Sequence, residues 1–158
     1  MNSNNQPRTP VPSQERTRVD RSVLTWLNTY PFIPETVSVI KTEPQLPVDG
    51  EGMAMSAITN AYINKKYILG GYQAEYTFKI IYRIKPGNST NARLEALEML
   101  NRMGDWCTEN KPDLSENIHV IQVLPTAQAE LYAPYTNGDE DYFITMRITY
   151  SVSKPLLS

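Results

Sequence analysis

Residues 70–85 read GGYQAEYTFKIIYRIK, and this stretch decides the class of fold. An apolar residue at every second position is typical of a β-strand with one buried face. After the two glycines, this pattern is made by Tyr72, Ala74, Tyr76, Phe78, Ile80, Tyr82 and Ile84. At about 3.3 Å per residue the strand would extend roughly 46 Å, whereas a common strand has only ~5–6 residues. The sequence therefore predicts an unusually long strand in a small protein.

A second long strand is predicted near the C-terminus, in DYFITMRITYSVSK (141–154). Its apolar face carries Tyr142, Ile144, Met146, Ile148, Tyr150 and Val152. On the opposite faces of the two strands lie Ile81 and Phe143, so a sheet built from them would be apolar on both sides. A long open edge also invites pairing with another chain. We therefore expect the long strands to form a subunit interface as well as a core.

The strand at 72–85 is expected to be the second half of a hairpin. AITNAYINKKYIL (57–69) leads into Gly70-Gly71, and Gly-Gly favours a two-residue turn because both positions need positive φ. The best helix of the chain follows in residues 89–111, where apolar residues recur at helical spacing and Ser89 is among the candidate N-caps. Gly104 lowers helix propensity by about 1 kcal/mol relative to alanine, which indicates a close approach of another backbone.

Shorter elements complete the predicted fold. VDRSVLTWLNTY (19–30) predicts a helix that ends before Pro31, and TVSVIKTE (36–43) predicts a strand. Two further strands are expected on either side of Pro125. The order of helix, strand, hairpin, helix and hairpin predicts an α+β two-layer sandwich, with a largely antiparallel sheet and both helices on one face.

The length of 158 residues fits a single domain. We expect residues 1–18 to form a flexible N-terminal arm, 19–154 the domain and 155–158 a loose tail. Through residue 21 the arm region carries four arginines against two acids, although the whole chain has a formal net charge of −2. There is no apolar run long enough for a membrane span and no secretory signal. The single cysteine fits a reducing compartment such as the cytoplasm.

The residues that could carry chemistry are few. His119 is the one histidine and is expected to point outward from a strand, and Cys107 lies on the apolar face of the long helix, where a packing role is expected. The acidic run Asp139, Glu140 and Asp141 lacks the alternate spacing of a calcium loop and is interpreted as a solvated turn. No nucleotide-binding or nucleophile motif is present. We therefore predict no enzyme, no cofactor and no metal site.

Four stretches together resemble a known protein family. They are VLTWLNTYPFIP (23–34), KKYILGGYQAEYTFKIIYRI (65–84), ARLEALEMLNRMGDWC (92–107) and GDEDYFITMRITYSVSK (138–154). In sequence and order they resemble the small neck proteins of long-tailed bacteriophages, which are often labelled minor capsid proteins and are similar to tail terminators. The resemblance covers roughly residues 20–154. The N-terminal arm has no counterpart in the family pattern.

The resemblance implies a virion protein without catalytic residues, assembled in the host cytoplasm. It implies a homo-oligomeric ring, usually a hexamer, that caps the tail tube protein and later docks on the head connector or closure protein. DNA would pass through such a ring without sequence-specific contact. No membrane is involved.

Under this interpretation three surfaces are expected to make contacts. The first is the hairpin tip with Lys65, Lys66, Gly70 and Gly71. The second is the acidic turn 139–141, whose charge is opposite to that of the lysines, so the two could meet between adjacent subunits of a heterologous ring. The third is the loop PQLPVDGEGMAM (44–55), flanked by Met53 and Met55, as a contact with the tube or connector.

Three other functions remain open at this point. A head-completion or head-closure protein of the neck would have a similar size and no chemistry. A small ligand-binding domain or enzyme would need a pocket with convergent polar groups. A single-strand nucleic-acid binder would stack bases on some of the ten tyrosines, although the chain outside the arm is net acidic.

Overall fold

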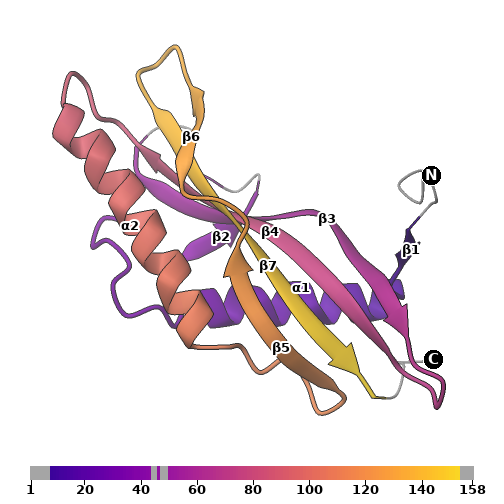
Figure 1. Ribbon diagram of the computed structural model, residues 1–158. Coiled ribbons are helices and arrows are strands. Elements are labelled where there is room, and N and C mark those ends of the chain that lie inside the picture. The colour runs from indigo at the N-terminus through magenta and orange to yellow at the C-terminus, as the bar shows by residue number, and fades with distance from the viewer. Residues whose placement is uncertain (1–7, 44–45, 47–49, 154–158) are drawn as a thin grey trace.

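The computed structural model describes residues 8–43, 46 and 50–153. In this part of the chain, two helices cover one face of a seven-stranded sheet, as Figure 1 shows. The helices are α1 (Ser13–Leu27) and α2 (Thr90–Glu109). The strands are β1 (Thr9–Pro10), β2 (Ile40–Thr42), β3 (Gly52–Lys66), β4 (Tyr72–Ile84), β5 (Ile118–Pro125), β6 (Glu130–Pro134) and β7 (Glu140–Val152). The α+β two-layer sandwich is thus confirmed, and the sheet is antiparallel except where β2 runs parallel to β3.

The two long strands predicted from the sequence are the centre of the sheet. β4 and β7 each have 13 residues and pair with each other from Tyr72↔Val152 to Ile84↔Glu140. β3 covers the other edge of β4, while β5 and β6 follow one another along the far edge of β7. The length of β4 is therefore used within one chain, and it does not by itself require a neighbouring subunit.

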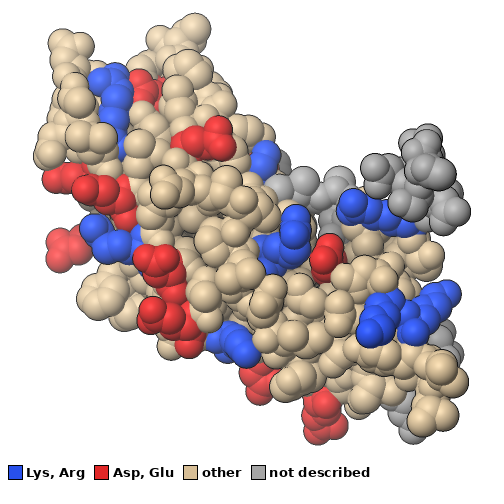
Figure 2. Space-filling view, viewed as in Figure 1, with Lys and Arg blue, Asp and Glu red and all other residues tan. Residues whose placement is uncertain are grey.

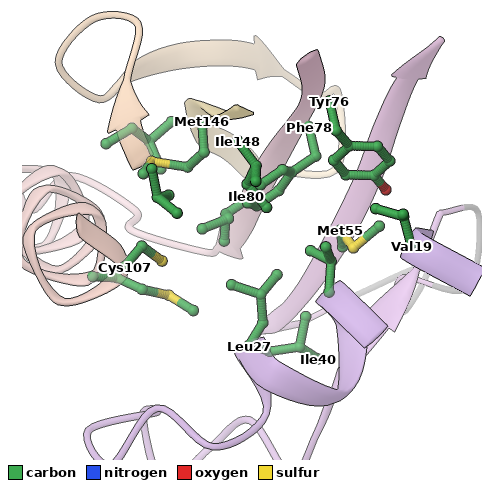
Figure 3. Packing of buried hydrophobic residues seen from close by; sticks show 14 of the residues in the cluster. Val19, Leu27, Ile40, Met55, Tyr76, Phe78, Ile80, Cys107, Met146 and Ile148 are labelled. Atoms are coloured by element: carbon green, nitrogen blue, oxygen red, sulfur yellow. The ribbon is translucent and has the colours of Figure 1, made fainter. Parts of the chain in front are cut away.

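The core lies between the sheet and the two helices. Alternate residues of β4 and β7 point toward the helices, because side chains of a strand alternate between its faces. α1 contributes Val19, Val23 and Leu27 to this core, and α2 contributes Leu100, Met103 and Cys107. Figure 3 shows Leu27 and Cys107 across the core from Ile80 and Met146 of the sheet, and Val19 beside Tyr76.

The face of the sheet away from the helices is closed locally by its own side chains. Ile81 is fully buried there and lies opposite Phe143 in the β4–β7 register. The ring of Tyr132, from β6, packs on Phe143 with 5.1 Å between centroids, and Lys79 lies over both rings. The apolar residues that seemed to need a partner subunit are thus largely covered within the chain.

The N-terminal part differs from the prediction. α1 begins at Ser13, whereas the sequence predicted a flexible arm to residue 18. β1 pairs with the end of β3, and both Val11 and Glu15 are buried. The start of the helix was missed because its first inward position is Glu15, a charged residue. Residues 1–7 and the predicted tail 155–158 lie outside the described residues.

The hairpin between β3 and β4 also differs from the predicted two-residue Gly-Gly turn. Tyr67 accepts a hydrogen bond from Gly70 N at 3.2 Å and donates one from its own N to Gly71 O at 3.1 Å. Ile68 and Leu69 therefore occupy the centre of the turn, and the two glycines follow it with φ of +97° and +82°. A Cβ on Gly71 would lie 2.3 Å from the Val152 carbonyl oxygen, so this close approach requires glycine.

Candidate assembly surfaces

The hairpin tip, residues 67–71, presents two aliphatic side chains to solvent. Ile68 is 101% exposed and Leu69 is 99% exposed. Lys65 and Lys66 precede the tip and are exposed too. Figure 2 shows basic side chains gathered over the end of β3 beside this tip. Large exposed apolar side chains next to charged ones are typical of a protein–protein contact site.

A second exposed apolar feature, the aromatic groove, lies where the loop after α1 meets α2. Its walls contain Tyr30, Phe32 and Trp106, and it has a volume of about 460 Å³. The ring of Tyr30 packs edge-on against those of Trp106 and Phe32, with centroids 5.4 and 5.8 Å apart. Phe32 is nevertheless 73% exposed.

Neighbouring contacts hold the aromatic groove in shape. Trp106 stacks on Trp26 of α1 at 5.6 Å, and Trp26 Nε1 donates a hydrogen bond to the Asn110 carbonyl at 2.7 Å. The rim carries Asp105 and Glu109 together with Arg102. The groove thus combines a rigid aromatic floor with charged groups at its edge.

The acidic run 139–141 is not the solvated turn that the sequence predicted. The carboxylate of Asp141 receives two hydrogen bonds from Arg83, at 2.7 and 2.9 Å, and one from Tyr135 at 2.7 Å. Asp139 lies 4.0 Å from Lys85, and both aspartates are 1% exposed. Hydrogen bonding to Asp141 raises the pKa of Arg83, which reflects how firmly the pair is held.

The middle acid of the run is also paired. Glu140 accepts hydrogen bonds from Arg93 at 2.9 Å and from Tyr142 at 2.6 Å. The bonds from Arg93, followed by that from Tyr142, hold the pKa of Glu140 below its ordinary value. The run therefore joins β7 to β4 and α2 within one chain, which physically explains why it is not solvated.

The other predicted contact residues fall into two groups. Lys65, Lys66, Gly70 and Gly71 are brought together at the hairpin end, as expected. Met53 and Met55 are instead in the core, with 1% and 3% exposure, because β3 begins at Gly52 and both face the helices. The loop between them and β2 lies largely outside the described residues, at 44–45 and 47–49.

The most exposed apolar residues are not among the contact residues that the sequence predicts. The strand pattern predicts Ile68 and Leu69 at the end of a strand, although two aliphatic residues between a lysine pair and a glycine pair are a visible signal. Phe32 was likewise passed over between two prolines. The aromatic groove itself had no local signal, since Tyr30 and Trp106 are far apart in the chain.

The two residues considered for catalysis lie in ordinary structural settings. His119 is exposed on β5, as predicted. Cys107 is completely buried, and burial raises the pKa of its thiol to about 12, in agreement with a packing role. Among the described residues, no group of three His, Cys, Asp or Glu side chains is arranged to hold a metal ion. No helix in this part of the chain is long and apolar enough to cross a membrane.

Two carboxylates of α1 accept hydrogen bonds from tyrosine hydroxyls of the sheet. Glu15 is fully buried and accepts hydrogen bonds from Tyr72 and, at 2.7 Å, from Tyr150. Tyr76 donates to Asp20 in the same way. Burial is the main reason that the pKa values of these three tyrosines lie above the ordinary value, and the adjacent carboxylates raise them further.

Several tyrosines away from the core have a cation over the ring. Arg83 lies 4.8 Å from the Tyr135 centroid and Lys79 lies 4.5 Å from that of Tyr132. Arg8 lies 5.0 Å from the ring of Tyr62. One face of each of these rings is thus engaged in a cation–π contact.

The comparisons with known proteins concern the fold. No protein-family model matches the chain, and no curated protein matches it by sequence. A chain in the solved structure of the virion of a native gene transfer agent particle has a similar fold, with a TM-score of 0.51. The two are 13% identical, and the match covers 87% of this chain and 91% of that one.

Proposed function

We propose that this chain is a structural protein of a phage-like virion, and that it forms the ring at the neck that caps the tail tube and joins it to the head connector. The observation that carries the proposal is the similarity in fold to a virion chain, which extends over 87% of this chain and 91% of the other. The resemblance of four sequence stretches to phage neck proteins supports the same role independently.

The exposed surfaces agree with a subunit of an assembly. The hairpin tip and the aromatic groove both expose large apolar side chains, and neither has a covering segment among the described residues. The two residues considered for catalysis do not speak against a structural role. Cys107 is packed in the core, and His119 lies on an outer strand. The chain is expected to act through its surfaces.

The other functions have less support. A head-closure protein would use the same exposed surfaces as a tail terminator, but its partner would be the filled head instead of the tail tube. Stacking of single-stranded nucleic acid has less support because the chain outside the N-terminal arm is net acidic. A strongly salt-dependent affinity for single-stranded nucleic acid would support this function.

The proposal is tested by light scattering over a concentration series, with and without tail tubes from the same virion. A ring-sized species, either free or formed on tubes, is expected. Binding to filled heads with no binding to tubes would indicate head closure instead. A chain that stays monomeric and binds neither tail tubes nor filled heads would overturn the virion role.

A further inference from the structure

We propose that the hairpin tip of one copy of this chain inserts into the aromatic groove of the next copy. The inference deepens the proposed ring function, because it names the two surfaces that join neighbouring subunits. The occupant of the groove is therefore a second copy of the chain, and the contacting residues are Ile68 and Leu69 against Tyr30, Phe32 and Trp106.

The first argument is that the two features match in chemistry and size. The tip carries two aliphatic side chains that are 99% or more exposed, so each gains from burial in an apolar site. The groove has a volume of about 460 Å³ beside its aromatic rings, which is enough space for two aliphatic side chains. Aromatic residues such as Trp106 are also enriched at the energetic centre of interfaces.

The second argument is that the charges around the two features are opposite. Lys65 and Lys66 precede the tip, and both are exposed. The groove has Asp105 and Glu109 on its rim, also exposed, with Arg102 as the basic exception. Opposite charges that surround an apolar contact steer the approach and set its orientation.

The third argument is that one chain cannot bring its own tip to its own groove. Tyr72, next to the tip, bonds to Glu15 in the first turn of α1, whereas Tyr30 follows the last turn. The 15 residues of α1 separate the two sites by about 22 Å. Figure 1 shows the β3–β4 tip near one end of α1 and the loop after α1 near the other.

Two different patches at opposite ends of a subunit produce a head-to-tail contact. Such a heterologous contact closes into a ring when the rotation between subunits permits it. A pair of identical patches would give a two-fold dimer instead. The locations of the tip and groove therefore fit the heterologous contact of a ring subunit.

The first test measures self-association by light scattering. Substituting both Ile68→Ser and Leu69→Ser is expected to weaken assembly at least ~30-fold, as loss of a hot spot does. Phe32→Ser should have the same effect from the groove side. Leu131→Ser is the matched control, because Leu131 is 47% exposed on β6 and belongs to neither surface. Circular dichroism and the Tm should be unchanged in all of these variants, since the altered side chains are exposed.

The second test uses cross-linking and does not depend on loss of assembly. Two separate proteins are made, one with Leu69→Cys and the other with Phe32→Cys, and mixed under a mild oxidant. A disulfide-linked dimer is expected to form at least ~10-fold faster in the mixture than in either protein alone, because the interface brings the two thiols together whereas exposed thiols of one kind meet only by collision. Cys107 is fully buried, so the wild-type chain provides the background.

A third test exchanges the charges. Lys65→Glu with Lys66→Glu should weaken assembly, and the additional changes Asp105→Lys with Glu109→Lys should restore it. If the variant with Ile68→Ser and Leu69→Ser assembles at the same concentration as the wild-type chain, this interface is overturned. The proposed ring function is not affected by that result. Homodimers from Leu69→Cys alone that form as fast as the mixed dimer would also overturn the interface. The interface is refuted if the wild-type chain does not associate, with or without tail tubes, and the Leu69→Cys and Phe32→Cys proteins do not cross-link in their mixture. Binding of the wild-type chain to tail tubes then decides the function separately.

Discussion

At the scale of single residues, Glu15 has the most demanding environment in the structure. It is a carboxylate with no exposed surface, and its two oxygens are engaged by the hydroxyls of Tyr72 and Tyr150. A buried charge is costly unless hydrogen bonds compensate it. These bonds therefore fix the first turn of α1 onto the ends of β4 and β7.

We predict that Tyr150→Phe lowers the free energy of unfolding by about 2 kcal/mol. The substitution keeps the ring and removes one hydrogen bond to a charged group, for which ~1.5–3 kcal/mol is typical. The measurement is urea-induced unfolding followed by circular dichroism.

Tyr132→Phe is the control for this experiment. It also removes one hydroxyl, but Tyr132 is 44% exposed, so a change within about 0.5 kcal/mol is expected. Equal effects of the two substitutions would show that the Glu15 contact does not stabilise the fold.

At the scale of elements, the packing of α2 on β7 depends on one glycine. A Cβ on Gly104 would lie 2.8 Å from Cδ1 of Ile144 and 3.7 Å from Sδ of Met146. The close approach expected from the sequence is therefore present, although the neighbouring group is a side chain rather than a backbone. The helix tolerates this glycine because its absent side chain allows α2 to sit directly on the sheet.

Gly104→Ala is predicted to destabilise the protein by about 1 kcal/mol. The gain in helix propensity, about 1 kcal/mol, is smaller than the ~1–3 kcal/mol cost of overpacking a core. Ile144→Val removes the clashing Cδ1, so in that background Gly104→Ala should be neutral or stabilising.

A double-mutant cycle measured by chemical denaturation checks this prediction. Ile144→Val alone should cost ~0.5–1.5 kcal/mol, and the coupling between the two sites should be about 1 kcal/mol in favour of the double variant. Additive effects would mean that Gly104 does not limit the approach of α2 to Ile144.

At the scale of the whole molecule, the buried tyrosines make stability depend on alkaline pH. The pKa of Tyr142 is raised to about 12, and those of Tyr72, Tyr76, Tyr82 and Tyr150 are raised as well, with burial as the first cause. In the unfolded chain these groups ionise near their ordinary value of 10.0. Above that pH the unfolded state binds fewer protons than the folded state.

The contribution of the tyrosines to the free energy of unfolding is therefore predicted to be fully present below about pH 10 and to be lost as the pH rises further. Each tyrosine that stays protonated in the fold contributes a slope of up to about 1.4 kcal/mol per pH unit. Cys107 starts this loss at about pH 9, the ordinary value for a thiol.

Denaturant unfolding at a series of alkaline pH values, combined with tyrosinate absorbance, measures this effect. Ionisation of the buried tyrosines should coincide with unfolding, and the slope should decrease in Tyr150→Phe. Smooth ionisation near pH 10 in a chain that stays folded would contradict the prediction.

The features that can be predicted from the sequence are those encoded by neighbouring residues. Period-two alternation in β4 and β7 and helical spacing in α2 establish each element and its inward face, because burial acts on the same residues that carry the pattern. The α+β sandwich, the packing role of Cys107 and the cap at Ser89, which accepts a hydrogen bond from Ala92 N at 3.0 Å, all follow from local pattern. The exact helix start and hairpin turn did not follow, since Glu15 and Ile68 interrupt the usual composition of those positions.

Which polar groups are buried and which apolar groups are exposed depends on how distant elements of the chain pack together. Glu15 meets Tyr150 across 135 positions of the chain, and Asp141 meets Arg83 across 58. The residues near Glu15 and Asp141 in the sequence do not indicate these partners. From their charge alone, both side chains were expected to be exposed to solvent. The hairpin tip and the aromatic groove are defined in the same way, because exposure depends on where distant elements pack. The physical reason is that pairing and burial are properties of three-dimensional proximity, which a local pattern does not contain.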